Sequence, residues 1–453
     1  MGRRKPKSEW EQDRETAMDG LFASMQQAGS DDLGMPVSVG SDSLRDAVGL
    51  PLPALCLRYL YQATVMPLSR ITQIAGTEGC CKTALLYEMF RWHLMYGGGV
   101  VLTENEGKDA ADLRHSIYQW DKSYVDRTLV AATASVNEWQ KVWTHYISNF
   151  SKQQTADGGP GRTFPVIFGL DSLTATSTDE EQQTIDKEGS ASRGYPLMAQ
   201  LITRYMRTMP KRLQGFPFSV VGTNHLKPGT DQQGRPKNTI PGGMSVKFME
   251  TCEIIMKRAP GAYDIDRADC QGLRLLMKMQ KNSAGPSRRQ LQVDFLWWFA
   301  EHPETGEWVQ YSAWDWDTAT VELLFSFENV SGKKTLFNAL RDVTGIRSAS
   351  RSQRTAYSEL LGIPKGDPQH YRVVAEALES RQDILEEVYK LLGVLKKNEF
   401  THGVDYLRSR QAAEAEACQA AAGGETRQLL PLVDGEGNPE FSPEADITEA
   451  GDE

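Results

Sequence analysis

The sequence predicts an α/β protein built on a mostly parallel central sheet flanked by helices. Short apolar runs with strand character alternate with amphipathic stretches of helical period along the middle of the chain, which is the pattern of strand–helix–strand units. The early runs are almost continuously apolar, as expected for strands covered on both faces. A composition of 40% hydrophobic and 24% charged residues excludes a largely disordered or collagen-like chain.

The strands are expected where the apolar runs lie. These runs are Ile71–Ala75, Val100–Thr103, Leu129–Ala132, Val166–Asp171, Phe218–Asn224, Glu253–Met256, Leu273–Met279 and Leu291–Trp297. Amphipathic segments between the early runs, Ala84–Tyr96 and Asn137–Phe150, are expected to be helices. The last three runs follow one another closely, with the turn signals Pro260-Gly261 and Gly285-Pro286 between them. We therefore expect an antiparallel extension at one edge of the sheet.

Smaller units are expected on both sides of a core at residues 51–325. Residues 1–50 carry short helical patterns broken by glycine and predict a small helical appendage with a role in oligomerisation. Residues 326–410 predict a helical domain, because apolar residues recur there at helical spacing. They are Leu385, Val388, Leu391, Leu392 and Leu395.

Residues 411–453 are rich in Ala, Gly, Glu and Pro and predict a disordered acidic tail. The formal net charge of the chain is −10, and the segment from Glu425 to Glu453 holds nine acidic residues and one basic residue. The rest of the chain is therefore close to neutral, and the whole-chain charge says little about partners.

Several patterns bear on the compartment. No uncharged apolar run approaches the roughly 18 residues that span a bilayer, and the basic start Met1–Lys7 is not followed by an apolar segment. We expect neither a membrane partner nor a secretory signal. The cysteines form no C-x-x-C pair, which is typical of a reduced, cytoplasmic protein without a structural metal site. They are Cys56, Cys80, Cys81, Cys252, Cys270 and Cys418.

A glycine-containing loop joins the first of these strands to the helix that follows it. Its sequence is Gly76-Thr77-Glu78-Gly79-Cys80-Cys81-Lys82-Thr83, which is close to the phosphate-loop pattern G-x-x-x-x-G-K-[ST]. In such a loop, backbone N–H groups and the positive helix end surround phosphate oxygens. Lys82 would pair with the β- and γ-phosphates, and the Thr83 hydroxyl would bind Mg²⁺. The loop therefore predicts ATP and Mg²⁺ as ligands.

Cys81 departs from the pattern, because it stands where the second glycine is expected. Its Cβ crowds the approach of phosphate to the backbone, and we expect helical φ and ψ angles to tolerate it. Two alternatives are a chance turn ahead of Lys82-Thr83 and redox or metal chemistry at Cys80-Cys81. The strand and helix flanks favour the phosphate loop, and adjacent cysteines bridge or chelate poorly.

Carboxylates follow two of the other strands. Asp171 ends an apolar strand and can hold the water shell of Mg²⁺, with a helix N-cap as the alternative role. Glu104 and Glu106 follow Val100–Thr103, and one of them could orient and deprotonate a water molecule. Exposed glutamates are also common at strand ends.

A polar pair, Asn224-His225, ends the strand that starts at Phe218. A side chain at that position could sense a γ-phosphate, although a lone histidine is more often a surface or capping residue.

These segments, in this order, resemble the RecA/UvsX family of homologous-recombination ATPases over about residues 52–324. The resemblance implies a RecA-type P-loop NTPase core. Glu78 matches a glutamate inside the family's phosphate loop, and Leu102–Glu106 resembles the strand that carries the catalytic glutamate, here Glu106. Leu170-Asp171-Ser172 resembles the Asp-Ser strand end. His225 replaces the glutamine of the family's Asn-Gln switch between nucleotide and DNA.

The resemblance also implies DNA-binding segments. Thr239–Gly243 through Lys247-Phe248 is similar to the end of the second DNA-binding loop, and the first would fall near Lys187–Tyr195. The window from His225 to Lys247 contains four basic residues and one acidic residue, Asp231, so its net charge is +3. A positively charged segment suits binding to a phosphate backbone. A solvated surface loop is the alternative. The candidate DNA-binding residues are Arg193, Lys227, Arg235, Lys237, Gly242, Gly243 and Lys247.

A further match concerns the neighbouring subunit. Lys278–Asn282 resembles the segment that reaches the nucleotide bound by the adjacent protomer, and Lys281 is the residue carried over. Ser283 departs from the family, which has a second basic residue there. One helical face carries a basic stripe, which is equally consistent with a solvent-exposed face and with a second DNA contact. Its residues are Arg204, Arg207, Lys211 and Arg212.

The expected function is therefore that of an ATP-dependent recombinase. It would form a helical filament on single-stranded DNA, pair it with homologous duplex DNA, and hydrolyse ATP with Lys82, Glu106 and His225 as catalytic groups. Single-strand-binding or loader proteins are expected partners, and the divergence suggests a phage-encoded member acting in the bacterial cytoplasm. The alternatives are a ring helicase with the same core and a DNA-binding accessory protein that does not hydrolyse ATP.

Overall fold

The structure is a computed structural model in which part of the chain is described. The described residues are 49–106, 111–156, 164–173, 175–179, 195–213, 216–230, 236–239, 249–261, 264–267, 269–283, 287–302, 304–326, 340, 360–363 and 371–399. Side chains at 151, 153–156, 195–197, 199, 227–230, 236–239, 325 and 326 are not described. All described residues belong to one compact unit, Met1–Gly403. The expected appendage, apart from Gly49 and Leu50, and the expected tail lie outside them.

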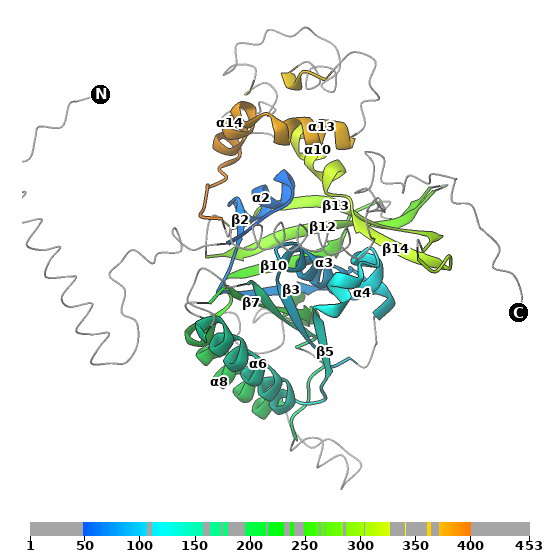
Figure 1. Ribbon diagram of the computed structural model, residues 1–453. Coiled ribbons are helices and arrows are strands. Elements are labelled where there is room, and N and C mark those ends of the chain that lie inside the picture. Colours follow the sequence, from blue (N-terminus) through cyan, green and yellow to red (C-terminus); the bar gives the residue numbers. More distant parts are fainter. Residues whose placement is uncertain are drawn as a thin grey trace, which may run out of the picture. The chain divides into compact units, whose positions relative to one another are not determined.

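Strands and helices alternate along this unit (Figure 1). The strands are β1 (Gly49–Pro51), β2 (Val65–Pro67), β3 (Ile71–Gly76), β4 (Gly99–Glu104), β5 (Thr128–Ala132), β6 (Val166–Asp171), β7 (Phe218–His225), β8 (Lys227–Thr230), β9 (Pro236–Thr239), β10 (Cys252–Arg258), β11 (Asp264–Asp266), β12 (Gln271–Asn282), β13 (Gln290–Glu301) and β14 (Trp308–Trp314). The helices are α2 (Leu55–Tyr61), α3 (Lys82–Met95), α4 (Ala111–Ile117), α5 (Lys122–Asp126), α6 (Val136–Ala156), α8 (Tyr195–Leu213), α10 (Trp316–Ser326), α13 (Tyr371–Ser380) and α14 (Gln382–Leu392).

The central sheet has the strand order β14-β13-β12-β10-β3-β7-β6-β4-β5, with β11 paired to β12. Strands β10, β3, β7, β6, β4 and β5 are parallel to their neighbours in this half, and β12, β13 and β14 extend it in antiparallel fashion. Every expected strand forms, and the antiparallel extension is confirmed. The sheet is mixed: its larger part is parallel, as expected, and β11 and β14, which were not predicted, lengthen the antiparallel extension.

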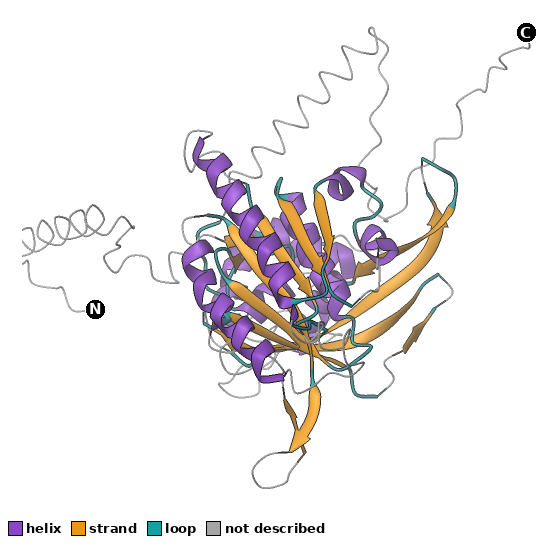
Figure 2. Cartoon of the chain, turned by 90° about the horizontal axis from the view of Figure 1, so that it is seen from below, coloured by secondary structure: helices purple, strands orange, loops and turns teal. Residues whose placement is uncertain are grey.

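Helices cover the parallel half on both faces because side chains alternate along its strands. Ile74 and Leu102 point to the face where they share a core with α3. Val101 and Phe168 point to the opposite face, where they share a core with α6 and α8. These two helices pack side by side (Figure 1), and in the view from below the long helices lie in front of the strands (Figure 2).

The last helices pack against the start of the unit. Leu385 and Val388 of α14 share a buried cluster with Leu55 of α2 and Val321 of α10. Helix α14 ends at Leu392 because Gly393 follows it with φ of 71°, a left-handed conformation that favours glycine. Leu395, expected on the helical stripe, therefore lies beyond the helix and is 46% exposed.

The parallel strands bring their carboxyl ends to one edge of the sheet. The phosphate loop follows β3, the two glutamates follow or end β4, Asp171 ends β6, and His225 ends β7. Since β3, β7, β6 and β4 are consecutive in the sheet, these side chains come from neighbouring strands. No helix in the described part of the chain is long and apolar enough to cross a bilayer.

Candidate nucleotide-binding site

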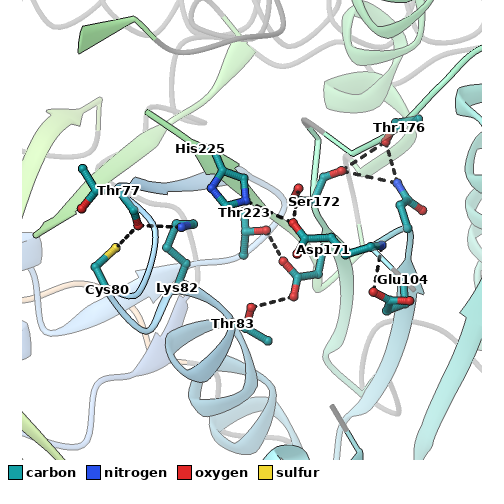
Figure 3. Close-up of polar contacts among 12 residues, drawn as sticks. Thr77, Cys80, Lys82, Thr83, Glu104, Asp171, Ser172, Thr176, Thr223 and His225 are labelled. Carbon is teal, nitrogen blue, oxygen red and sulfur yellow. Dashed lines mark hydrogen bonds and ion pairs between the residues drawn. The ribbon is translucent and has the colours of Figure 1, made fainter. Parts of the chain in front are cut away.

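The phosphate loop is held by bonds to its own backbone. The Thr77 carbonyl oxygen accepts from both Cys80 Sγ and Lys82 Nζ, each at 2.9 Å (Figure 3). Lys82 is 8% exposed and begins α3, so its charge lies at the positive end of that helix. Gly76 has no room for a side chain, because a Cβ there would lie 2.5 Å from Cys80 Sγ and 2.6 Å from the Met256 carbonyl oxygen.

Cys81 adopts a conformation that the sequence did not predict. Its φ and ψ are 56° and 35°, which is the left-handed region, whereas right-handed helical angles were expected. The reason is geometric: the loop must turn into α3 here, and this turn is the one that a glycine makes without strain. Burial raises the pKa of the Cys81 thiol to about 12, which favours the neutral thiol over the reactive thiolate.

Asp171 joins the loop to the sheet. Its Oδ2 accepts from Thr83 Oγ1 at 2.7 Å, and its Oδ1 accepts from Thr223 Oγ1 on β7 (Figure 3). Burial raises the pKa of the Asp171 carboxyl above its usual value, while hydrogen bonds from Thr223 and Thr83 act in the opposite direction.

The paired oxygens of Thr83 and Asp171 fit a magnesium ion. Mg²⁺ prefers oxygen ligands at about 2.1 Å in an octahedron, which sets adjacent ligand oxygens about 3 Å apart. The 2.7 Å between Thr83 Oγ1 and Asp171 Oδ2 is close to that spacing. These two residues can therefore share an ion beside the phosphate loop.

Glu106 and His225 meet at the next position along the edge. Glu106 Oε1 accepts from Ser172 Oγ at 2.7 Å and lies 3.2 Å from His225 Nε2. The Glu106 side chain is 15% exposed and that of His225 is 32% exposed. Glu104 has a different role, since its Oε1 accepts from the Glu106 backbone N–H at 2.9 Å. The structure thus brings Glu106, rather than Glu104, against the histidine.

Asn105 fixes the tip of β4 between these carboxylates. Its backbone N–H donates to the Asp171 carbonyl oxygen at 2.8 Å. Its side-chain amide donates to Thr176 Oγ1 at 2.6 Å, and its side-chain oxygen accepts from Thr133 Oγ1. Glu106 is therefore presented on a turn that is tied to β6 and to the end of β5.

Lys281 lies away from the phosphate loop of its own chain. It is opposite Glu253 on β10, whereas Met256 of β10 lies beside Gly76 at the loop. Three residues of strand separate the two positions, which is about 10 Å. Its role at a neighbour's nucleotide stays a prediction.

The candidate DNA-binding segment begins directly after His225. β8 and β9 pair as an antiparallel ribbon with Gly229 opposite Lys237, so part of a segment expected as a loop has regular structure. The side chains of Lys227 and Lys237 are not described. Arg193, Arg235, Gly242, Gly243 and Lys247 lie outside the described residues.

Three contacts at the site were not predicted from the sequence, although Ser172 belongs to the Asp-Ser strand end. Ser172 holds Glu106 and Thr223 holds Asp171, while Arg258 Nε donates to the Gly79 carbonyl oxygen at 3.2 Å. Ser172 and Thr223 stand at or just after the carboxyl ends of buried strands, and that position was the available signal. Arg258 gave none, because its contact depends on the pairing of β10 with β3.

No protein-family model matches the chain, and a search of curated proteins finds no match.

Proposed function

We propose that this protein is an ATP-dependent DNA recombinase that assembles as a filament on single-stranded DNA and pairs it with homologous duplex DNA. The observation that carries the proposal is the 3.2 Å contact between Glu106 and His225. It joins the candidate base for ATP hydrolysis to the strand that continues into the candidate DNA-binding segment.

The arrangement around the loop supports ATP hydrolysis. Lys82 and the loop N–H groups would bind the phosphates, and Thr83 with Asp171 would hold Mg²⁺, which supplies charge neutralisation when bound. Glu106 would orient a water molecule and take its proton as the water oxygen attacks the γ-phosphorus and ADP departs. Ser172 keeps the Glu106 carboxylate in place through its 2.7 Å hydrogen bond.

His225 would couple the nucleotide to DNA. A γ-phosphate carries more negative charge than the Glu106 carboxylate and is also a charged acceptor for the imidazole, so binding of ATP would draw His225 from Glu106. Lys227 lies two residues further along the chain, and a shift of His225 therefore displaces the start of β8. The segment would then close on the phosphate backbone of a single strand.

Oligonucleotide binding with different nucleotides tests this coupling. We expect a fluorescent single strand to bind at least tenfold more tightly with a slowly hydrolysed ATP analogue than with ADP, as measured by anisotropy at fixed salt. His225→Ala should remove the difference while ATP still binds, and His225→Gln should retain much of it. Equal affinity of the wild type with the analogue, with ADP and without nucleotide would refute the proposal.

Electron microscopy and phosphate release separate the rival functions. With the analogue and single-stranded DNA we expect helical filaments, whereas closed rings would indicate a helicase. We expect DNA-stimulated phosphate release that Lys82→Ala abolishes. Background release from both the wild type and this variant would indicate an accessory protein that does not hydrolyse ATP.

A further inference from the structure

Arg258 brings a second cation to the phosphate loop from a neighbouring strand. It is the last residue of β10, which runs parallel to β3 with Met256 beside Gly76. Arg258 therefore emerges at the sheet edge where the loop begins. Its Nε donates to the Gly79 carbonyl oxygen at 3.2 Å.

The bond is made at the turn that shapes the loop. Gly79 has φ of 67°, in the left-handed region, and a Cβ at this position would lie 2.9 Å from Arg258 Nη2. Cys81, two residues later, is also left-handed, with φ of 56°. A hydrogen bond that fixes the Gly79 carbonyl also fixes the N–H of Cys80, because the two groups belong to one planar peptide. In phosphate loops such N–H groups contact the ligand.

Arg258 also acts on the loop electrostatically. Burial raises the pKa of the Cys80 and Cys81 thiols, while the charges of Lys82 and Arg258 act in the opposite direction on both. Two cations from different elements therefore influence the same short loop, one from the start of α3 and one from the end of β10.

We propose that Arg258 is a positioning residue, which holds the phosphate loop in its binding conformation through the hydrogen bond to Gly79. This inference rests on the proposed nucleotide-binding function. A loop that is already ordered loses less entropy when a ligand binds. The Gly79 turn shapes the whole loop. Loss of the hydrogen bond from Arg258 should therefore weaken the binding of ATP and of ADP to the same extent.

Substitutions can separate the hydrogen bond from the charge. Arg258→Ala removes both, whereas Arg258→Gln keeps an N–H donor at the ε position without the charge. We expect Arg258→Ala to weaken ATP and ADP binding about tenfold each, the low end for a hydrogen bond from a charged donor because Arg258 is exposed. Arg258→Gln should stay within about threefold of the wild type. Lys257→Ala is the matched control, since Lys257 is the exposed neighbour on β10 and should bind as the wild type does.

Fluorescent ATP and ADP analogues measure these affinities, and hydrogen exchange of residues 77–83 without nucleotide measures the loop itself. Exchange should be faster in Arg258→Ala and unchanged in Arg258→Gln, at equal melting temperatures. Wild-type affinity and exchange in Arg258→Ala would overturn the inference, as would a loss confined to ATP, which indicates γ-phosphate contact. Equal losses in the Gln and Ala variants would also overturn it, because charge would then be the cause. If neither the wild type nor Lys257→Ala binds nucleotide, the proposed function is wrong, and the inference about Arg258 fails with it.

Discussion

The left-handed conformation of Cys81 predicts an unusual order of stability among small substitutions. An L-residue pays about 1–2 kcal/mol to adopt φ near 56°, and glycine avoids this cost. We therefore expect Cys81→Gly to be more stable than Cys81→Ala. Comparing the two variants with each other removes the loss of the thiol, which they share.

The size of the difference follows from two opposing effects. Relief of the left-handed strain favours glycine by about 1–2 kcal/mol. The greater freedom of glycine in the unfolded chain opposes it by about 0.5–1 kcal/mol. The net advantage of Cys81→Gly over Cys81→Ala is therefore about 0–1.5 kcal/mol. Cys80 provides the control, because it is not among the positive-φ residues. The free energy of unfolding of Cys80→Ala should therefore exceed that of Cys80→Gly by about 0.5–1 kcal/mol.

Urea unfolding without nucleotide, followed by circular dichroism, gives the four free energies. Relative to alanine, glycine should be more favourable at position 81 than at position 80. If alanine is favoured over glycine at position 81 by as much as it is at position 80, the left-handed conformation of Cys81 is wrong. The reasoning about the loop would then fail with it.

Three further predictions concern the carboxylates. Glu106→Gln should lower kcat for ATP hydrolysis about 10²–10⁴-fold, as loss of a general base does, while the Kd for ATP changes little; a parallel loss of ATP binding would contradict this role. Burial raises the pKa of Asp171 in the folded state above its value in the unfolded chain. Below the unfolded pKa the carboxyl is protonated in both states and costs no stability, and the cost develops as the pH rises from there through the folded pKa. Asp171→Asn should therefore increase the free energy of unfolding at neutral pH, with the gain vanishing near pH 4, and should abolish hydrolysis; an equal gain at both pH values in urea unfolding would be inconsistent. Arg274 holds Asp294, whose side chain is 1% exposed, at 2.7 Å, so Arg274→Ala should destabilise the fold by about 3 kcal/mol by stranding a buried charge. Arg372→Ala, which removes an exposed ion pair, should cost under about 0.5 kcal/mol. Equal losses of unfolding free energy in Arg274→Ala and Arg372→Ala, measured in denaturant, would contradict this difference between the buried and the exposed pair.

The strand positions could be predicted because burial leaves a local pattern. The run Val166–Asp171 is apolar because β6 is covered on both faces, and every residue of it is buried. β14 escaped prediction because it is an edge strand, and most of its side chains are only partly buried. A half-exposed edge needs no continuous apolar run.

The candidate site was predictable by residue type but not by contact. Asp171 and Glu106 could be identified because polar residues at the ends of buried strands face a shared edge. Their partners Ser172 and Thr223 depend on which strands are neighbours and in what register. That information is not local in the sequence. The conformation of Cys81 was predicted wrongly for a similar reason, since the closure of the loop sets its φ rather than its own preference.

β10 is bonded along both edges, to β3 from Cys252 to Met256 and to β12 from Cys252 to Arg258. It cannot slide lengthwise, because a slip of one residue would break both ladders and turn its core-facing side chains to the opposite face. A displacement applied where the strand begins therefore moves β10 together with the strands paired to it. Because β3 is one of those strands, the base of the phosphate loop and the Arg258 guanidinium bonded to it would move together.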